Sequence, residues 1–496
     1  MPARARTALA AFLLATLTFS AAAYASPTQL DPSFNGDGLL TLHSASHDEI
    51  LTDLSALRFG KTMLLVVTRS NPAIELYRLR QDGTPDPTFG GGDGVVTFGP
   101  AAGYEDVRLA VDPHNGDAYV STFLDNGTTS PTTIWRINND GILDTAYGGG
   151  GTGSVTFDHR SVQGLLALPG GLLVMAGTDL AAHTATVWRL DDAGGPDPQF
   201  GIGGAAPLSS DANDELTGLA RSPGGRVVVA GDRYDPTSSK LLAFRLTRGG
   251  TLDPTFSGDG RTAVNPSRTG VTTSTVWTPQ VLVRPDTSTV FVAGLNQNDG
   301  GFVNTLLVAG LTPAGRTDPV FGTHVRTGIS ETWGESALER DGKVVIGGFL
   351  PPSPSTDNAV IRITAKGRLD PSWSGDGVLP LPGTSDTVAL GITPSGRIEV
   401  GRTVGTGPYD AEVRALQGTP TPTCNGELAT QFGNGKANKI IGTRYDDVLV
   451  GLDGDDVLKG STGADVLCGN AGKDTLVGGK GIDVLLGGPG KDTLKQ

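Results

Sequence analysis

The first residues whose types and spacing could bind a metal lie near the N-terminus. In the stretch LDPSFNGDG at 30–38, Asp31, Ser33 and Asn35 are spaced like the start of a calcium-binding loop, whose oxygens coordinate the ion. Such a loop needs an acid at its twelfth position, which here is Leu42. The stretch also recurs, with glycine in place of Asn35 in other copies. We therefore expect the acid to fix a turn by bonding nearby backbone N–H groups.

A second set of acids lies in the last 64 residues, where the sequence repeats every nine residues. Seven units run in frame from 433, and each begins with glycine. Position eight is isoleucine in the first unit and leucine in the other six, which argues against a flexible Gly/Asp-rich tail. Position six is Asn438 in the first unit and aspartate in the rest: Asp447, Asp456, Asp465, Asp474, Asp483 and Asp492.

These units resemble the RTX, or hemolysin-type, calcium-binding repeat, whose pattern is G-G-x-G-x-D-x-U-x. The resemblance implies a parallel β-roll in which two units form one coil, so that units 18 residues apart stack. The six-residue half of a unit would form a turn and its last three residues a short strand, with position eight pointing inward. Calcium takes six to eight oxygen ligands, which stacked turns would supply as backbone carbonyls and carboxylates.

The stacking implied by this resemblance brings the aspartates together in four pairs: Asp447 with Asp465, Asp456 with Asp474, Asp465 with Asp483, and Asp474 with Asp492. The glycines of the same turns complete the expected metal site: Gly451, Gly454, Gly460, Gly463, Gly469, Gly472, Gly478, Gly481, Gly487 and Gly490. Lys436, Asn438 and Tyr445 depart from the pattern, so the first two units should form a weakened end. Because the converging oxygens repel one another, we expect calcium binding to be coupled to folding.

The chain has two cysteines, Cys424 and Cys468. A disulfide could form if the protein is exported, as its N-terminus suggests (see below), and the even number of cysteines favours one. Cys468 occupies position nine of its unit, which should face outward and be reachable. A bond would pin the segment that begins at Cys424 as a cap along the roll. Two unpaired thiols are the alternative.

A longer repeat occupies most of the remaining chain. LDPSF at 30 returns at 85, 143, 196, 252, 317 and 369, always with an acid and with an aromatic residue three positions later. Between copies, alternating apolar residues and Gly/Asp/Asn turns indicate about four strands, the content of one propeller blade. We therefore predict an all-β protein, a seven-bladed β-propeller followed by a small parallel β-roll. The motif should connect one blade to the next, with its aromatic residue between adjacent blades.

The motif with its flanks also resembles a known repeat. RLRQDGTPDPTFGGGDG at 78–94 carries most of the signature of the delta-60 repeat, a bacterial extracytoplasmic family, and FRLTRGGTLDPTFSGDG at 244–260 nearly as much. The third copy departs from the signature, with Thr145 in place of proline. The resemblance implies a propeller-like scaffold and no particular activity.

The N-terminus has the features of a secretory signal peptide. Arg4 and Arg6 precede a short apolar run at 8–19, and Ala23-Tyr24-Ala25 is a small-x-small cleavage site. We expect residues 1–25 to be removed near Ala25 and the mature protein to be secreted, with no membrane span. The expected domains are the propeller at 26–418, a Thr/Pro linker and cap segment at 419–432, and the calcium-binding β-roll at 433–496.

Charge and motifs narrow the function. The formal net charge of −14 argues against nucleic acid and is compatible with cations. No zinc motif, nucleophile elbow or phosphate loop is present, and the only local histidine cluster is His43 and His47 with Asp48. We expect Ca²⁺ as the bound ion and assign no catalytic residue.

Three roles remain open. The first is a secreted calcium-binding scaffold or adhesion protein with a cell-surface or polysaccharide ligand. The second is a propeller enzyme, quinoprotein dehydrogenase-like or a hydrolase, with a site at the channel mouth. The third is a structural surface protein.

Overall fold

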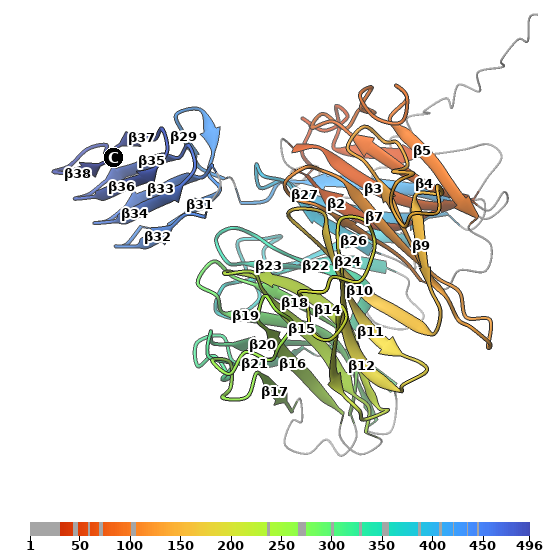
Figure 1. Ribbon diagram of the computed structural model, residues 1–496. Helices are drawn as coiled ribbons and strands as arrows, with labels where there is room; N and C mark the ends of the chain where they lie inside the picture. The colour runs from red at the N-terminus through yellow and green to blue at the C-terminus, as the bar shows by residue number, and fades with distance from the viewer. Residues whose placement is uncertain are drawn as a thin grey trace, which may run out of the picture.

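A computed structural model describes residues 30–496, apart from 43–47, 58–59, 69–72, 101–105, 236–238, 266–273, 299–301, 327–329, 350–356, 385–387, 406–408, 420, 434 and 444–445. The expected signal peptide and the His43 and His47 pair therefore lie outside the described residues. The described elements are β-strands, arranged as a seven-bladed propeller and a C-terminal parallel roll (Figure 1). The all-β prediction, with its seven blades, is confirmed.

The first six blades are four-stranded antiparallel sheets whose strands follow the chain in order. Blades one to three comprise β2 (Glu49–Ala56), β3 (Thr62–Thr68), β4 (Ala73–Leu79) and β5 (Val95–Pro100); β6 (Asp106–Val111), β7 (Ala118–Phe123), β8 (Thr132–Ile137) and β9 (Ser154–Phe157); and β10 (Arg160–Leu168), β11 (Leu172–Asp179), β12 (Thr184–Leu190) and β13 (Ala205–Ser209). Blades four to six comprise β14 (Asp214–Ser222), β15 (Arg226–Arg233), β16 (Lys240–Leu246) and β17 (Arg261–Val264); β18 (Ser274–Val283), β19 (Thr289–Asn298), β20 (Phe302–Leu311) and β21 (Thr323–Arg326); and β22 (Ser330–Leu338), β23 (Val344–Phe349), β24 (Asp357–Ile363) and β25 (Val378–Thr384).

The seventh blade joins the two ends of the propeller sequence. It comprises β26 (Val388–Ile392), β27 (Ile398–Val404) and β28 (Asp410–Leu416), and its outer strand is β1 (Leu39–Leu42) from the N-terminal end. β1 pairs antiparallel with β28, with Leu39 opposite Arg414. This pairing closes the ring, so the outer strand of the last blade comes from the first repeat.

The recurring motif lies inside each blade, at the turn between the third and the outer strand. Asp86, for example, lies between β4 and β5, which belong to one sheet. The prediction that the motif connects blades is therefore wrong. The prediction divided the chain from one motif to the next. A blade instead begins at its inner strand, which follows the motif and the outer strand of the preceding blade.

The motif acid fixes its turn in the expected way. In all seven copies the carboxylate accepts a hydrogen bond from the backbone N–H two residues on, as from Ser33 to Asp31 at 3.0 Å and from Thr88 to Asp86 at 3.1 Å. The motif aromatics are also buried: Phe34, Phe89, Tyr147, Phe200, Phe256, Phe321 and Trp373. Phe89 lies against Gly141 in the turn of the next blade, where a Cβ would clash with its ring. The aromatic residue therefore does pack between adjacent blades.

An arginine completes the motif. Arg78 lies eight residues before Asp86, forms a salt bridge to it at 2.8 Å, and stacks 4.6 Å from the centroid of Phe89. The same salt bridge recurs four more times: Arg136–Asp144, Arg189–Asp197, Arg245–Asp253 and Arg362–Asp370. These contacts explain why the acid recurs without a metal, because each of these five carboxylates has a guanidinium as its counter-ion.

Two blades lack that arginine and obtain one from elsewhere. Gly310 occupies the position in blade five, because a Cβ there would overlap Phe321. Arg284, from the turn between β18 and β19, lies 4.7 Å over the ring of Phe321 instead. In blade seven, Arg397 lies 5.0 Å over Phe34 in the same way.

The C-terminal units form two parallel sheets. One contains β31 (Gln431–Phe432), β33 (Val448–Asp453), β35 (Val466–Ala471) and β37 (Val484–Leu486). The other contains β32 (Lys439–Ile441), β34 (Val457–Thr462), β36 (Thr475–Lys480) and β38 (Thr493–Lys495). Leu449 pairs with Leu467 and Leu458 with Leu476, which is the predicted 18-residue offset.

The roll core follows the nine-residue period. Ile440, Leu449, Leu458, Leu467 and Leu476 form one buried cluster between the two sheets. Leu494, in the last unit, is 49% exposed. The central strands are six residues long and run into the next unit, so the turn is shorter than the expected six residues. A short hairpin, β29 (Thr423–Cys424) and β30 (Glu427–Leu428), precedes the roll.

Candidate functional site

The position-six aspartates stack along the roll as the sequence pattern predicts. Each bonds its partner one coil away, with the backbone N–H of one residue donating to the carboxylate of the other. The donor and acceptor pairs are Asp447 to Asp465 at 2.8 Å, Asp456 to Asp474 at 2.8 Å, Asp465 to Asp483 at 2.9 Å, and Asp474 to Asp492 at 2.9 Å. The four expected pairs therefore lie together in the structure.

These hydrogen bonds use only one oxygen of each carboxylate. The other oxygen, Oδ2, is buried and has no hydrogen-bond partner among the described residues in Asp456, Asp465, Asp474 and Asp483. Buried polar atoms in proteins are nearly always satisfied, and a negatively charged oxygen most of all. Four equivalent orphaned oxygens in a row fit a cation better than a packing accident.

The glycines at position one leave room beside these oxygens. A Cβ on Gly460 would overlap Oδ2 of Asp465, and it would lie 2.5 Å from the carbonyl oxygen of Gly478 in the next coil. The same carboxylate and carbonyl surround Gly451, with Asp456, and Gly469, with Asp474. Carboxylate and carbonyl oxygens are the ligands that calcium prefers. The residues present therefore fit calcium.

Gly478 and Gly487 occupy the same position in the last two units, beside Asp483 and Asp492. The position-four glycines serve the turn itself. Gly454, Gly463, Gly472 and Gly481 have φ between +115° and +150°, which other residues rarely adopt, whereas Gly490 is not in that region.

The electrostatics of the stacked acids are unfavourable without a metal. Burial raises the pKa of Asp465, and the charges of Asp447 and Asp483 raise it further. Burial and the charge of Asp474 likewise raise the pKa of Asp456. Burial also raises the pKa of Asp474, to which the charge of Asp492 adds. A divalent cation would relieve this repulsion.

The first coil differs from the others. Oδ2 of Asp447 accepts hydrogen bonds from the backbone N–H of Thr443 at 2.5 Å and from its hydroxyl at 2.8 Å. Asn438 takes the position of an aspartate in the first unit, and its backbone N–H donates to Asp456 at 2.7 Å. Tyr445 lies outside the described residues. A protein donor thus occupies the oxygen that is orphaned in the later coils.

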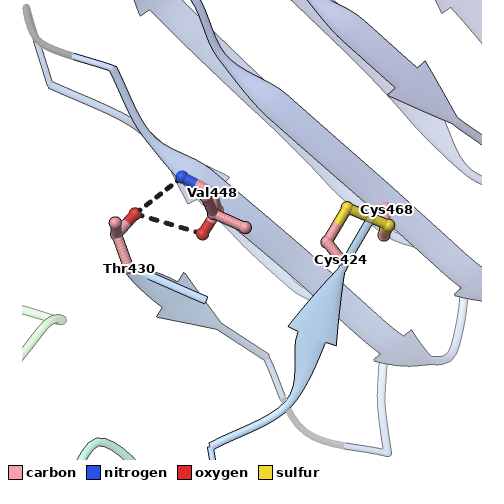
Figure 2. The surroundings of a disulfide bond; sticks show 4 residues. All are labelled: Cys424, Thr430, Val448 and Cys468. Carbon is pink, nitrogen blue, oxygen red and sulfur yellow. Dashed lines mark hydrogen bonds between the residues drawn. A yellow bond between two sulfur atoms is a disulfide. The ribbon is translucent and has the colours of Figure 1, made fainter. Parts of the chain in front are cut away.

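The segment before the roll covers one of its sheets (Figure 2). Cys424 and Cys468 form a disulfide. The Thr430 hydroxyl accepts a hydrogen bond from the backbone N–H of Val448 at 3.0 Å and donates one to its carbonyl at 3.1 Å. The disulfide and the cap expected from the sequence are therefore confirmed, and Cys468 is only 8% exposed because the segment that its bond fixes covers it. A bond that closes a loop with this 44-residue separation stabilises a fold by about 4 kcal/mol in the chain-entropy model.

The propeller has a polar channel that the sequence pattern did not identify. Inner strands carry β-bulges at its centre, and the bulge residues line a cavity of about 270 Å³. Asp53 accepts a hydrogen bond at 2.7 Å from Leu109 of the next blade, and Gln280 accepts one at 2.6 Å from Ser336. Their first role is therefore to join neighbouring inner strands. In the sequence, the channel could have been recognised by isolated polar residues in apolar strands, such as Asp53 in EILTDLSA.

Two acids meet in this channel. Asp53 and Glu335 are hydrogen-bonded to each other, and burial raises the pKa of both. Burial, together with the charge of Asp53, raises the pKa of Glu335 well above its usual range. Each acid also bonds the backbone of a neighbouring blade, at Leu109 and Leu390. The pair is thus part of the ring of contacts between inner strands.

Within the described ranges, no group of three or more His, Cys, Asp or Glu side chains gathers in a metal-binding arrangement. No helix within those ranges is long and apolar enough to cross a membrane.

Two family models match the chain. The RTX calcium-binding nonapeptide repeat matches residues 432–467 and 469–495. DUF5122, described as a β-propeller domain of unknown function, matches residues 64–89, 223–256 and 339–372. No curated protein matches.

Several solved structures are similar to this chain at low identity and low TM-score. One is a protein of unknown function from Dyadobacter fermentans, at 11% identity and a TM-score of 0.40, covering 77% of this chain and 100% of that one. Another is regucalcin, a calcium-binding protein from Agrobacterium tumefaciens, at 13% identity and a TM-score of 0.34, covering 63% and 91%. The β-propeller domain of the Trilobed protease from Pyrococcus furiosus has 8% identity and a TM-score of 0.40, covering 78% and 100%. Likeness at this level carries no argument about activity.

The family matches and the geometry agree on both parts of the molecule. RTX repeats bind calcium structurally, and together with the disulfide they suggest an extracellular protein. The chain contains DUF5122 β-propeller repeats, which are delta-60-like, and C-terminal RTX calcium-binding nonapeptide repeats.

Proposed function

We propose that this protein is a secreted calcium-binding protein, in which a propeller scaffold binds a cell-surface or polysaccharide ligand and the roll folds on calcium. The observation that carries the calcium part is the row of four buried, unpartnered carboxylate oxygens beside the position-one glycines. The ligands would be the carboxylates of Asp456, Asp465, Asp474 and Asp483, with weaker contributions from Asp447 and Asp492, and the carbonyls of the stacked turns.

The proposed location supports the proposed role. Residues 1–25 would act as the signal peptide, and their removal near Ala25 would release the mature chain. Extracellular calcium is typically far higher than cytosolic calcium. Since the roll oxygens repel one another without metal, the tail would remain unfolded until export and fold outside the cell.

The test is a titration of the full mature chain with calcium. Calorimetry measures the binding, and circular dichroism measures the strand content. We expect saturable binding of several calcium ions together with a gain of strand signal, and much weaker binding of magnesium, which prefers a rigid octahedral site. Binding of the chain to cells or to polysaccharide should disappear in chelator if the roll supports adhesion. An unchanged spectrum and no heat of binding would refute the calcium part.

A further inference from the structure

One mouth of the propeller channel contains a larger cavity, of about 600 Å³. The turns between the first and second strands of several blades form its wall. Its charged and titratable side chains are Lys61, Asp112, His114, Arg221 and Arg340. Lys61, Arg221 and Arg340 carry positive charge at neutral pH, whereas Asp112 is the one acid of the lining. The formal net charge of the whole chain is −14. The cavity is therefore locally cationic on an acidic protein.

Arg340 has no counter-ion in this wall. Its Nη1 is buried and has no hydrogen-bond partner among the described residues. Burial lowers its pKa, and no neighbouring charge offsets that effect. Lys61, by contrast, is paired with Asp86 at 2.8 Å. A partly buried guanidinium without an anion is costly, so it calls for a ligand.

The other blades show that the fold does not need these arginines. The residue equivalent to Arg340 is proline in five blades: Pro113, Pro169, Pro223, Pro285 and Pro394. The remaining equivalent, Arg58, lies outside the described residues. The residue equivalent to Arg221 is Ala, Val, Leu or Ile in each of the other six blades. Both arginines thus replace residues that suffice for the same turn elsewhere in the ring.

The cavity also offers an acceptor. Oδ2 of Asp112 is buried and has no hydrogen-bond partner among the described residues, while Oδ1 accepts the backbone N–H of His114 at 2.8 Å. An unsatisfied carboxylate oxygen attracts a hydroxyl donor. The wall therefore combines donors for an anionic group with an acceptor for a hydroxyl group.

We propose that this cavity binds a hydroxylated carboxylate, such as a sugar acid, either free or as a residue of a polysaccharide. Arg340 and Arg221 hold the carboxylate, and Asp112 accepts a hydrogen bond from a ligand hydroxyl. Guanidinium and carboxylate match as bidentate partners. This inference rests on the binding role proposed for the propeller and names its ligand class, and it does not depend on the roll.

The test is calorimetric titration of the calcium-loaded full chain with sodium glucuronate, with glucose and sodium sulfate as comparison probes. We expect glucuronate to bind, and glucose and sulfate to bind at least about tenfold more weakly, since each lacks one of the two recognised groups. Equal binding of sulfate and glucuronate, or no binding of either glucuronate or its oligomer, would overturn the proposal. An oligomer of glucuronate that binds where the monosaccharide does not would identify the polymer as the source.

The repeat itself supplies the variants. Arg340→Pro and Arg221→Val install the residues of other blades, so both should keep the melting temperature and weaken glucuronate binding about tenfold. Arg316→Gln, at an exposed position outside the cavity, is the matched control and should change neither. A fall in stability with unchanged binding would assign the arginines a structural role. Calcium-dependent folding of the roll in the same samples tests the proposed function separately.

Discussion

The propeller and the roll are both built from repeats with a recurring acid at one position, and the two regions stabilise that acid in opposite ways. Asp86 of the propeller lies against Arg78 and Lys61. Burial raises its pKa, but the hydrogen bonds from Lys61 and Thr88 and the charge of Arg78 outweigh that effect and lower it overall. Asp465 of the roll lies between Asp447 and Asp483, and its pKa is raised. A repeat that contains its own counter-ion can fold without a bound metal, whereas a repeat that stacks like charges needs a cation from solution.

The strongest test of this comparison is removal of calcium. With a chelator the roll should lose its strands, since no described residue forms a salt bridge with its stacked acids, while the propeller should be unaffected. Hydrogen exchange should become fast in β33 to β36 and remain slow in β3 and β11. Equal protection of the roll with and without chelator would contradict the contrast.

The second test removes a counter-ion from the propeller. Arg78→Ala leaves Asp86 without its buried partner and should destabilise the propeller by about 3–5 kcal/mol, measured by denaturant unfolding. Arg80→Ala, at an exposed position two residues on, is the control and should have little effect. Added calcium should not rescue the Arg78 variant, because the motif turn offers no row of open carboxylate oxygens.

The third test concerns a propeller acid that resembles those of the roll. Asp232 in β15 is buried, and burial together with the charges of Glu215 and Asp214 raises its pKa to about 8. Its folded-state pKa lies above the unfolded value, so the fold is most stable with respect to this group below about pH 4. That stability is lost as the pH rises toward 8.

Asp232→Asn should therefore stabilise the propeller by about 4 kcal/mol at pH 7, and the gain should vanish below about pH 4. Thermal melts of both proteins across this pH range measure it. A gain that did not depend on pH would show that the carboxyl is not the cause.

The smallest expected effect lies within the roll. Asp465→Asn removes a carboxylate with an orphaned oxygen and should lower calcium affinity about tenfold. Asp447→Asn is the matched change at a carboxylate already bonded by Thr443, and it should lower affinity by no more than about threefold. Calcium titration of the two variants separates them, and equal losses would show that the first coil binds like the others.

Periodicity predicted much of this molecule, because strand period and unit length are local properties of the chain. The nine-residue leucine pattern predicted the core of Leu449, Leu458, Leu467 and Leu476, and the 18-residue offset predicted which aspartates meet. The same logic predicted seven blades and the turn made by each motif acid. In the channel it failed, since bulges at Asp53 and Gln280 interrupt the strand period and have no fixed sequence signature.

The amino-acid sequence by itself determined the number of repeats, their strands and the acids that stack, since these follow from residue spacing alone. Only the tertiary structure decided which distant edges meet. Ring closure pairs β1 with β28, so the first motif completes the last blade and Arg397 lies over Phe34. Within blade five, folding places Arg284 over Phe321. The folded roll also determines how the cap segment buries Cys468. These outcomes depend on contacts between residues far apart in sequence, which a local pattern does not encode.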